Sequence, residues 1–123
     1  NLVPTSDWQH IGITAKHLAE STNADGIIAI TRTGETANLV SNAKPNGIPI
    51  YTFTNNKSTY SKLSLVGSSH AFLIGSIRDH DKALSKVISI LKKELSLSSG
   101  SKFILVSGIF SENHSEAIQI IKI

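Results

Sequence analysis

The chain has 123 residues, of which 40% are hydrophobic and 17% charged, and its formal net charge is +3. This length and composition predict one domain with a hydrophobic core and leave too little chain for two ordinary domains. The absence of cysteine excludes disulfides and thiolate metal sites. Only two of the twelve basic residues are arginines, and they are scattered, so we expect no nucleic-acid partner.

The sequence shows no sign of a membrane-spanning helix or of a secretion signal. No apolar run approaches the roughly 20 residues of a membrane-spanning helix, and residues 1–4 have neither the basic nor the apolar region of a secretion signal. We therefore expect a cytoplasmic protein without a membrane partner. The sequence contains no methionine, so we expect it to be part of a longer chain.

The first predicted elements are a helix and a strand. The helix begins after Ser6, where Gln9 completes the spacing of a capping box, and it ends near residues 21–23. The strand at 26–30 carries no polar residue on either alternating face, which is typical of a strand covered by helices on both sides of a sheet. We therefore place this strand in the middle of the sheet.

Strands and helices alternate along the rest of the chain. Strands are expected at 48–53, 70–74, 102–107 and 116–123, and helices are expected at 36–41 and from about residues 58 and 79 onward. The last loop is too short for a parallel crossover, which needs about a dozen residues. The pattern therefore predicts a three-layer α/β/α domain with a five-stranded mixed sheet in the order 3-2-1-4-5, in which strand 5 is antiparallel at one edge.

The loop after the central strand has the residue types of an anion site. Thr31, Arg32, Thr33 and Gly34 supply hydroxyls, a guanidinium and a permissive backbone where the next helix presents its unpaired N–H groups. Anions usually bind at this edge of an α/β sheet. The alternative is that Thr33 only caps the helix and Glu35 complements its dipole.

Two other clusters have the residue types of a reactive site. Asp79-His80-Asp81 contains metal-ligating side chains, but acids at a helix start are ordinary capping residues and no second cluster accompanies them. Ser107 and His114 are of the nucleophile and base types, but the chain lacks a G-x-S-x-G turn and an evident orienting acid. We therefore expect neither a metal site nor a self-contained hydrolase.

Several spaced motifs resemble the C-terminal domain of pyruvate kinase. Residues 23–34 resemble that family's Ala-rich strand ending in Thr-x-Ser/Thr-Gly, and Lys44-Pro45 matches its basic residue before proline. Residues 54–59 match a Thr-x-Asn-x-x-Thr helix start, and 99–108 match a glycine turn followed by an aliphatic strand and Ser/Thr-Gly. The resemblance covers about residues 14–123, and the order of the motifs makes it specific.

This resemblance implies one regulatory and subunit-assembly domain, spanning residues 1–123, that normally follows a catalytic barrel and a lid domain. Alone it would not turn over substrate. The parent enzyme would convert phosphoenolpyruvate and ADP to pyruvate and ATP in glycolysis, with Mg²⁺ and K⁺ held outside this chain, which itself would need no cofactor. The other possibility is a free-standing module that binds a phosphorylated metabolite.

The resemblance also implies a sugar-phosphate effector site. Its phosphate would be bound by Thr31, Arg32, Thr33, Gly34 and Thr36, and a second wall would contain Ser107, Gly108, Asn113 and Ser115. Glu35 departs from the basic or neutral residue common in effector-binding relatives. An acid within a few Å of a phosphate would weaken binding by about 1 kcal/mol or more, so we expect an attenuated site.

The last predicted strand is rich in isoleucine and would invite aggregation as a bare edge. In the family, this strand and the first helix pair two subunits about a two-fold axis. The resemblance therefore implies a homo-oligomer with Trp8, Ile11, Ile118, Ile120 and Ile121 at its interface. The alternative is that the strand's apolar side chains all face the core and the amino-terminal segment covers the edge.

Overall fold

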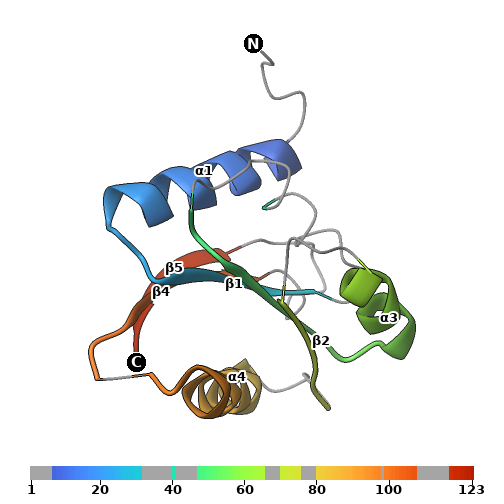
Figure 1. The fold of residues 1–123 in the computed structure, drawn as a ribbon. Helices are drawn as coiled ribbons and strands as arrows, with labels where there is room; N and C mark the ends of the chain where they lie inside the picture. The colour runs from blue at the N-terminus through green and yellow to red at the C-terminus, as the bar shows by residue number, and fades with distance from the viewer. Residues whose placement is uncertain are drawn as a thin grey trace.

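The computed structural model describes residues 7–31, 40, 47–65, 70–75, 80–97, 99–107 and 117–123, with only the backbone described at 7–9, 80 and 117. Its elements are α1 (Asp7–Ser21), β1 (Gly26–Ile30), β2 (Ile50–Thr54), α3 (Lys57–Leu65), β3 (His70–Leu73), α4 (His80–Leu95), β4 (Lys102–Ser107) and β5 (Ala117–Lys122). Figure 1 shows the sheet between α1 on one side and α4 on the other. The helix expected at 36–41 lies outside the described residues except for Val40, which is helical and buried.

The strands form one five-stranded sheet in the order β3-β2-β1-β4-β5. β1 is central and pairs in parallel with β2 and β4, while β3 pairs in parallel with β2. β5 is antiparallel to β4. Only residues 108–116 connect β4 to β5, fewer than a parallel crossover requires. The predicted strand order, the central position of residues 26–30 and the antiparallel last strand are therefore confirmed.

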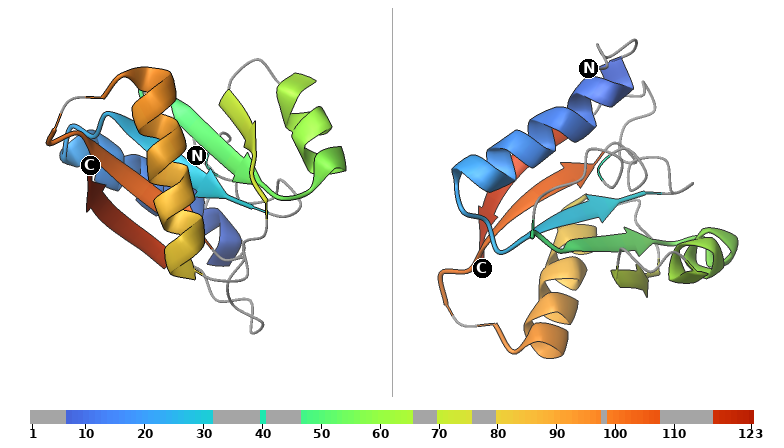
Figure 2. Two further views of the ribbon diagram at one scale, coloured as in Figure 1. Left: turned by 90° about the horizontal axis from the view of Figure 1, so that it is seen from below. Right: turned by 45° about the horizontal axis from the view of Figure 1, so that its top comes forward.

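The core has one layer on each face of the sheet, as the two views of Figure 2 show. All five residues of β1 are buried. Ile28 and Ile30 belong to the cluster on the α4 side, whereas Ile27 packs with Ala15 and Ala19 of α1 on the other side. This alternation explains why the strand carries no polar residue: both of its faces are covered by helices.

The centre of the sheet tolerates little extra volume. An added Cβ on Gly26 would lie 2.7 Å from the Tyr51 ring and 2.9 Å from the Phe103 ring, on the strands either side. The two rings are in edge contact, with their centroids 6.1 Å apart. Glycine at the start of β1 therefore lets the two aromatic residues close over the strand.

Several element boundaries differ from the expectation by one or two residues, and two of them have a local cause. β2 begins at Ile50 and not at 48, and Pro49 has no N–H to donate to the ladder although its C=O accepts from Ile27 N–H over 2.9 Å. α3 begins at Lys57 because Asn56 caps it: the Asn56 side-chain oxygen accepts from Thr59 N–H over 2.9 Å.

A set of hydrogen bonds fixes the end of α1 against the start of β4. The Lys102 ammonium donates to the Thr22 C=O over 3.0 Å, and Lys102 N–H donates to the Asp25 carboxylate over 2.9 Å. Asp25 N–H in turn donates to the Lys102 C=O over 2.7 Å. These bonds hold the end of α1 beside the start of β4. One side of the helix therefore faces β5, the strand next to β4.

Candidate functional site

The carboxyl ends of β1 and β4 lie side by side in the sheet. Ile30, the last residue of β1, pairs in register with Ser107, the last residue of β4. Thr31 follows directly, and its N–H donates to the Phe53 C=O over 2.9 Å. Thr31 and Ser107 are 2% and 3% exposed, so both hydroxyl-bearing side chains are buried at this edge. Thr31 and Ser107 are the first residues of the two predicted walls of the anion site, and the register places them at neighbouring strand ends.

Most residues of that expected site lie outside the part of the chain that the structure describes. Arg32, Thr33, Gly34 and Thr36 of the first wall, and Gly108, Asn113 and Ser115 of the second, lie outside the described residues. Glu35 lies outside them as well. What the structure gives is therefore the position of the two strand ends that carry the loops.

Strand order adds a physical reason to expect a ligand at this edge. From β1 the chain continues outward to β2 and β3, and then returns across the sheet to β4 on the other side of β1. The connections that follow β1 and β4 therefore leave in opposite directions. In open α/β sheets, ligands bind beyond the carboxyl ends of the strands at such a switch point. Thr31 and Ser107 flank it.

The second polar strand end, after β2, is occupied by local structure. The Thr54 hydroxyl oxygen accepts from Asn56 N–H over 3.2 Å, and the Asn56 side chain caps α3. Both groups are thus used to shape the turn and the helix start. The Thr-x-Asn-x-x-Thr motif at residues 54–59 therefore has a structural explanation.

The outer strand β5 presents one strongly exposed isoleucine. Ile120 is 48% exposed, and register places it opposite Ile104, on the same face as Ile118. The half-buried Ile118, Ile11 and Leu18 pack against the core cluster on the α1 side. Ile120 thus shares the face of β5 that carries the packed Ile118, but about half of its surface stays exposed.

The expected interface residues lie on two different faces of the sheet. Ile11 and Leu18 are related as i and i+7 on α1, whereas Glu20 points to the opposite side, toward the residues before β2. Ile11 and Leu18 therefore lie on the β5 side of the helix. We call Ile11, Leu18, Ile118 and Ile120 the α1–β5 seam. Ile121 lies on the other face, packed against the α4-side cluster, and nothing is described of the Trp8 side chain.

Sequence reasoning missed Leu18 as part of this surface. Its heptad spacing from Ile11 was a usable signal, but the spacing does not say which side of the helix faces β5. That side follows only from the position of α1 over β4.

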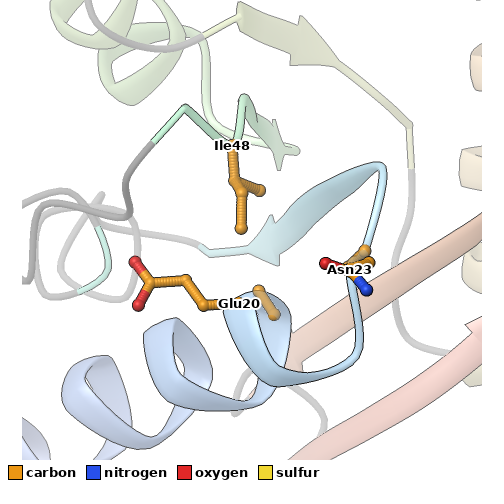
Figure 3. A pocket seen from close by; sticks show the side chains of 5 residues that line it. Glu20, Asn23 and Ile48 are labelled. Atoms are coloured by element: carbon orange, nitrogen blue, oxygen red, sulfur yellow. The ribbon is translucent and has the colours of Figure 1, made fainter.

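A separate small cavity lies at the opposite end of the sheet from Thr31. It measures about 400 Å³ and is lined by Ala19, Glu20, Asn23, Ala24 and Ile48. Figure 3 shows the Glu20 and Ile48 side chains on either side of the space between the end of α1 and the segment before β2. Asn23 has a φ of 53°, the left-handed conformation that lets the chain turn out of α1. One carboxylate and one amide make no catalytic arrangement here.

Titratable groups give no indication of a catalytic centre in the described ranges. Burial, and secondarily the Asp25 carboxylate, raises the pKa of Tyr51, which belongs to the core. Among the residues that the structure describes, no three His, Cys, Asp or Glu side chains gather to hold a metal. No helix in this part of the chain is long and apolar enough to cross a membrane.

Comparison with known proteins agrees with these features. Residues 9–123 match the family model for the pyruvate kinase alpha/beta domain. A pyruvate kinase of Eimeria tenella is 27% identical over 111 residues, which are 90% of this chain and 21% of that protein. A pyruvate kinase of Dictyostelium discoideum is 32% identical over 106 residues, 86% of this chain and 21% of that protein. The chain therefore spans about a fifth of the length of the curated relatives it matches.

Solved structures agree with the sequence matches. Two crystal structures of pyruvate kinase from Cryptosporidium parvum superpose with TM-scores of 0.84 and 0.83, at 26% and 25% identity. Each alignment covers 98% of this chain and 23% of the other. Because the match extends over nearly the whole chain in both sequence and fold, the chain belongs to the pyruvate kinase alpha/beta domain family.

Proposed function

We propose that this chain is the regulatory and subunit-assembly domain of a pyruvate kinase. The observation that carries the proposal is the contrast in coverage: 98% of this chain aligns with a pyruvate kinase structure, but with only 23% of it. The parent enzyme would be cytoplasmic and would transfer the phosphoryl group of phosphoenolpyruvate to ADP, using Mg²⁺ and K⁺ bound by its other domains. The described residues supply no candidate for that chemistry.

The α1–β5 seam supports the assembly part of the proposal. Ile120 is half exposed on the face of β5 that also carries the partly buried Ile118, and β5 is the last strand of the described sheet. A second copy placed about a two-fold axis would bury the same patch twice. Complete burial of one isoleucine side chain contributes about 1.5–3 kcal/mol. Because Ile120 is already about half buried, covering the rest would contribute about half of that value on each side of a symmetric pair.

The switch point between β1 and β4 supports the regulatory part. Buried Thr31 and Ser107 put the starting points of the two connections at one edge, and Arg32 follows Thr31 in the sequence. Helix N–H groups, hydroxyls and a guanidinium form a suitable environment for a phosphate. A sugar phosphate is the ligand class we propose there, with affinity lowered by Glu35.

Activity of the isolated chain tests the proposal. We expect no pyruvate from phosphoenolpyruvate and ADP in the presence of Mg²⁺ and K⁺, measured by coupling to lactate dehydrogenase. Full-length pyruvate kinase serves as the positive control. Sustained, protein-dependent turnover by these 123 residues would contradict the assignment of catalysis to other domains.

A further inference from the structure

The cavity between the end of α1 and the segment before β2 has one charged side chain in its described lining. Glu20 supplies a carboxylate and Asn23 an amide, while Ala19, Ala24 and Ile48 supply apolar surface. Its volume of about 400 Å³ lies within the range of small-molecule sites, roughly 300–1,000 Å³. The described lining thus combines a negative group with an apolar surface that a short alkyl chain can contact.

The backbone at the end of α1 adds negative character to this cavity. Asn23 N–H donates to the Glu20 C=O over 3.4 Å, and Ala24 N–H donates to the Ala19 C=O over 2.9 Å, so both N–H groups are used inside the turn. The carboxyl end of a helix also carries a partial negative charge, and the last turn of α1 contains no basic residue. The site therefore favours a cation over an anion.

An apolar side chain lies between the two polar ones. Figure 3 shows the Glu20 carboxylate and the Asn23 side chain on opposite sides of the space, with Ile48 projecting between them. Ile48 and Ala24 are half-buried and pack against the core cluster on the α1 side. Hard divalent cations take about six or more oxygen ligands, which one carboxylate and one distant amide do not supply. An ammonium group on an alkyl chain matches the lining better.

We propose that this cavity binds a small, free primary amine. The ammonium group donates hydrogen bonds to the Glu20 carboxylate, and the alkyl chain contacts Ile48 and the two alanines. Glu20 already has a polar interaction within the protein, but a carboxylate has about four acceptor positions, so the ligand adds to that interaction. The site is separate from the switch point, and the inference does not depend on the proposed function.

The charges of the neighbouring described residues are compatible with a bound cation. The Lys102 ammonium is held by the Thr22 C=O over 3.0 Å and is not among the described lining residues. Lys16 lies four residues before Glu20 on α1, in the Lys-to-Glu order that gives the weaker ion pair on a helix. Asp25, which is exposed just beyond the turn, adds negative charge.

A titration followed by amide NMR shifts tests the inference. The probes are n-butylamine, which like a lysine side chain is charged at pH 7, and 1-butanol, which has the same chain without the charge. Each is added to the whole chain. We expect saturable shifts at residues 19–24 and 47–48 with butylamine and weaker binding of butanol. Glu20→Gln should weaken butylamine binding by about three- to fivefold, as expected for a partly exposed ion pair, and leave butanol binding unchanged.

The matched control is Glu94→Gln, which removes the same charge at an exposed position of α4. It should leave the affinity for butylamine within about 1.5-fold of the natural chain. Ile48→Ala should weaken the binding of butylamine while leaving that of methylamine, which has no chain, unchanged. Circular dichroism of each variant verifies the fold, and Ile48→Val replaces Ile48→Ala if the latter unfolds.

A further probe, Nα-acetyl-lysine N-methylamide, distinguishes a free amine from the lysine side chain of another polypeptide. Binding no tighter than that of butylamine supports a free amine, whereas tighter binding makes a lysine side chain the occupant and contradicts the inference. The inference is also wrong if butylamine gives no saturable shifts at residues 19–24 and 47–48, or if butanol binds as tightly. Equal weakening by Glu20→Gln and Glu94→Gln would contradict it as well.

Discussion

A single hydroxyl group in the middle of the sheet has an energetic consequence. Thr52 is fully buried, and its Oγ1 has no hydrogen-bond partner. In register it lies between Ala29 and Ala71. A buried polar group without a partner costs about 1–3 kcal/mol, whereas valine has nearly the same shape and no such group.

Thr52→Val should therefore stabilise the domain by about 1 kcal/mol, measured by urea denaturation. The matched control is Thr54→Val, which removes a hydroxyl oxygen that accepts from Asn56 N–H over 3.2 Å. That change should destabilise by about 1 kcal/mol. A loss of stability in Thr52→Val as large as that in Thr54→Val would show that the Thr52 hydroxyl has a stabilising role.

Charge at the first loop determines the expected effector affinity. Glu35→Lys replaces an anion near the proposed phosphate site by a cation, and fructose bisphosphate should then bind at least about tenfold more tightly in a calorimetric titration. Glu20→Lys, at the opposite end of the sheet, is the control and should have little effect. Tight binding by the natural chain that does not change with Glu35→Lys would contradict the charge argument.

Among the elements, the strands were the most predictable. β1 is aliphatic on both faces and was placed in the centre, and the short final connection forced β5 to be antiparallel. The start of α3 was harder to predict from the sequence. Both Asn56 and Ser58 can cap a helix, and the choice depends on which side chain reaches an unpaired backbone N–H. Local geometry, not periodicity, decides that choice.

The cap of α3 can be tested directly. Asn56→Ala removes the acceptor of the Thr59 N–H and should lower the free energy of unfolding by about 1 kcal/mol. The neighbouring exposed Asn55→Ala is the matched control and should change it by less than about 0.5 kcal/mol. If urea denaturation gave the same change in the free energy of unfolding for Asn56→Ala and Asn55→Ala, Asn56 would not act as the helix cap.

At the scale of the whole molecule, sequence patterns identified strand ends better than surfaces. Thr31 directly follows β1 and Ser107 is the last residue of β4, and the sequence pattern already placed these two strands next to each other. In contrast, consecutive isoleucines at 120 and 121 cannot reveal which one faces outward until the register with β4 is known.

Two variants that each introduce one lysine test whether the α1–β5 seam is an assembly surface. Ile120→Lys places a charge in the α1–β5 seam, whereas Leu65→Lys places the same charge at the end of α3, where the leucine is 87% exposed. Circular dichroism should show an unchanged fold for both, since Ile120 is half exposed and Leu65 is almost fully exposed in the single chain. Differences between them in self-association then report on the seam.

Sedimentation equilibrium of the natural chain and these two variants tests the central claim most directly. The natural chain and Leu65→Lys should form dimers, and Ile120→Lys should weaken the dimer by about tenfold or more, because a two-fold pair loses the burial of two half-exposed isoleucines, about 0.8 kcal/mol each. A natural chain that remains monomeric at high concentration, or a dimer that Ile120→Lys leaves intact, would contradict assembly through the α1–β5 seam.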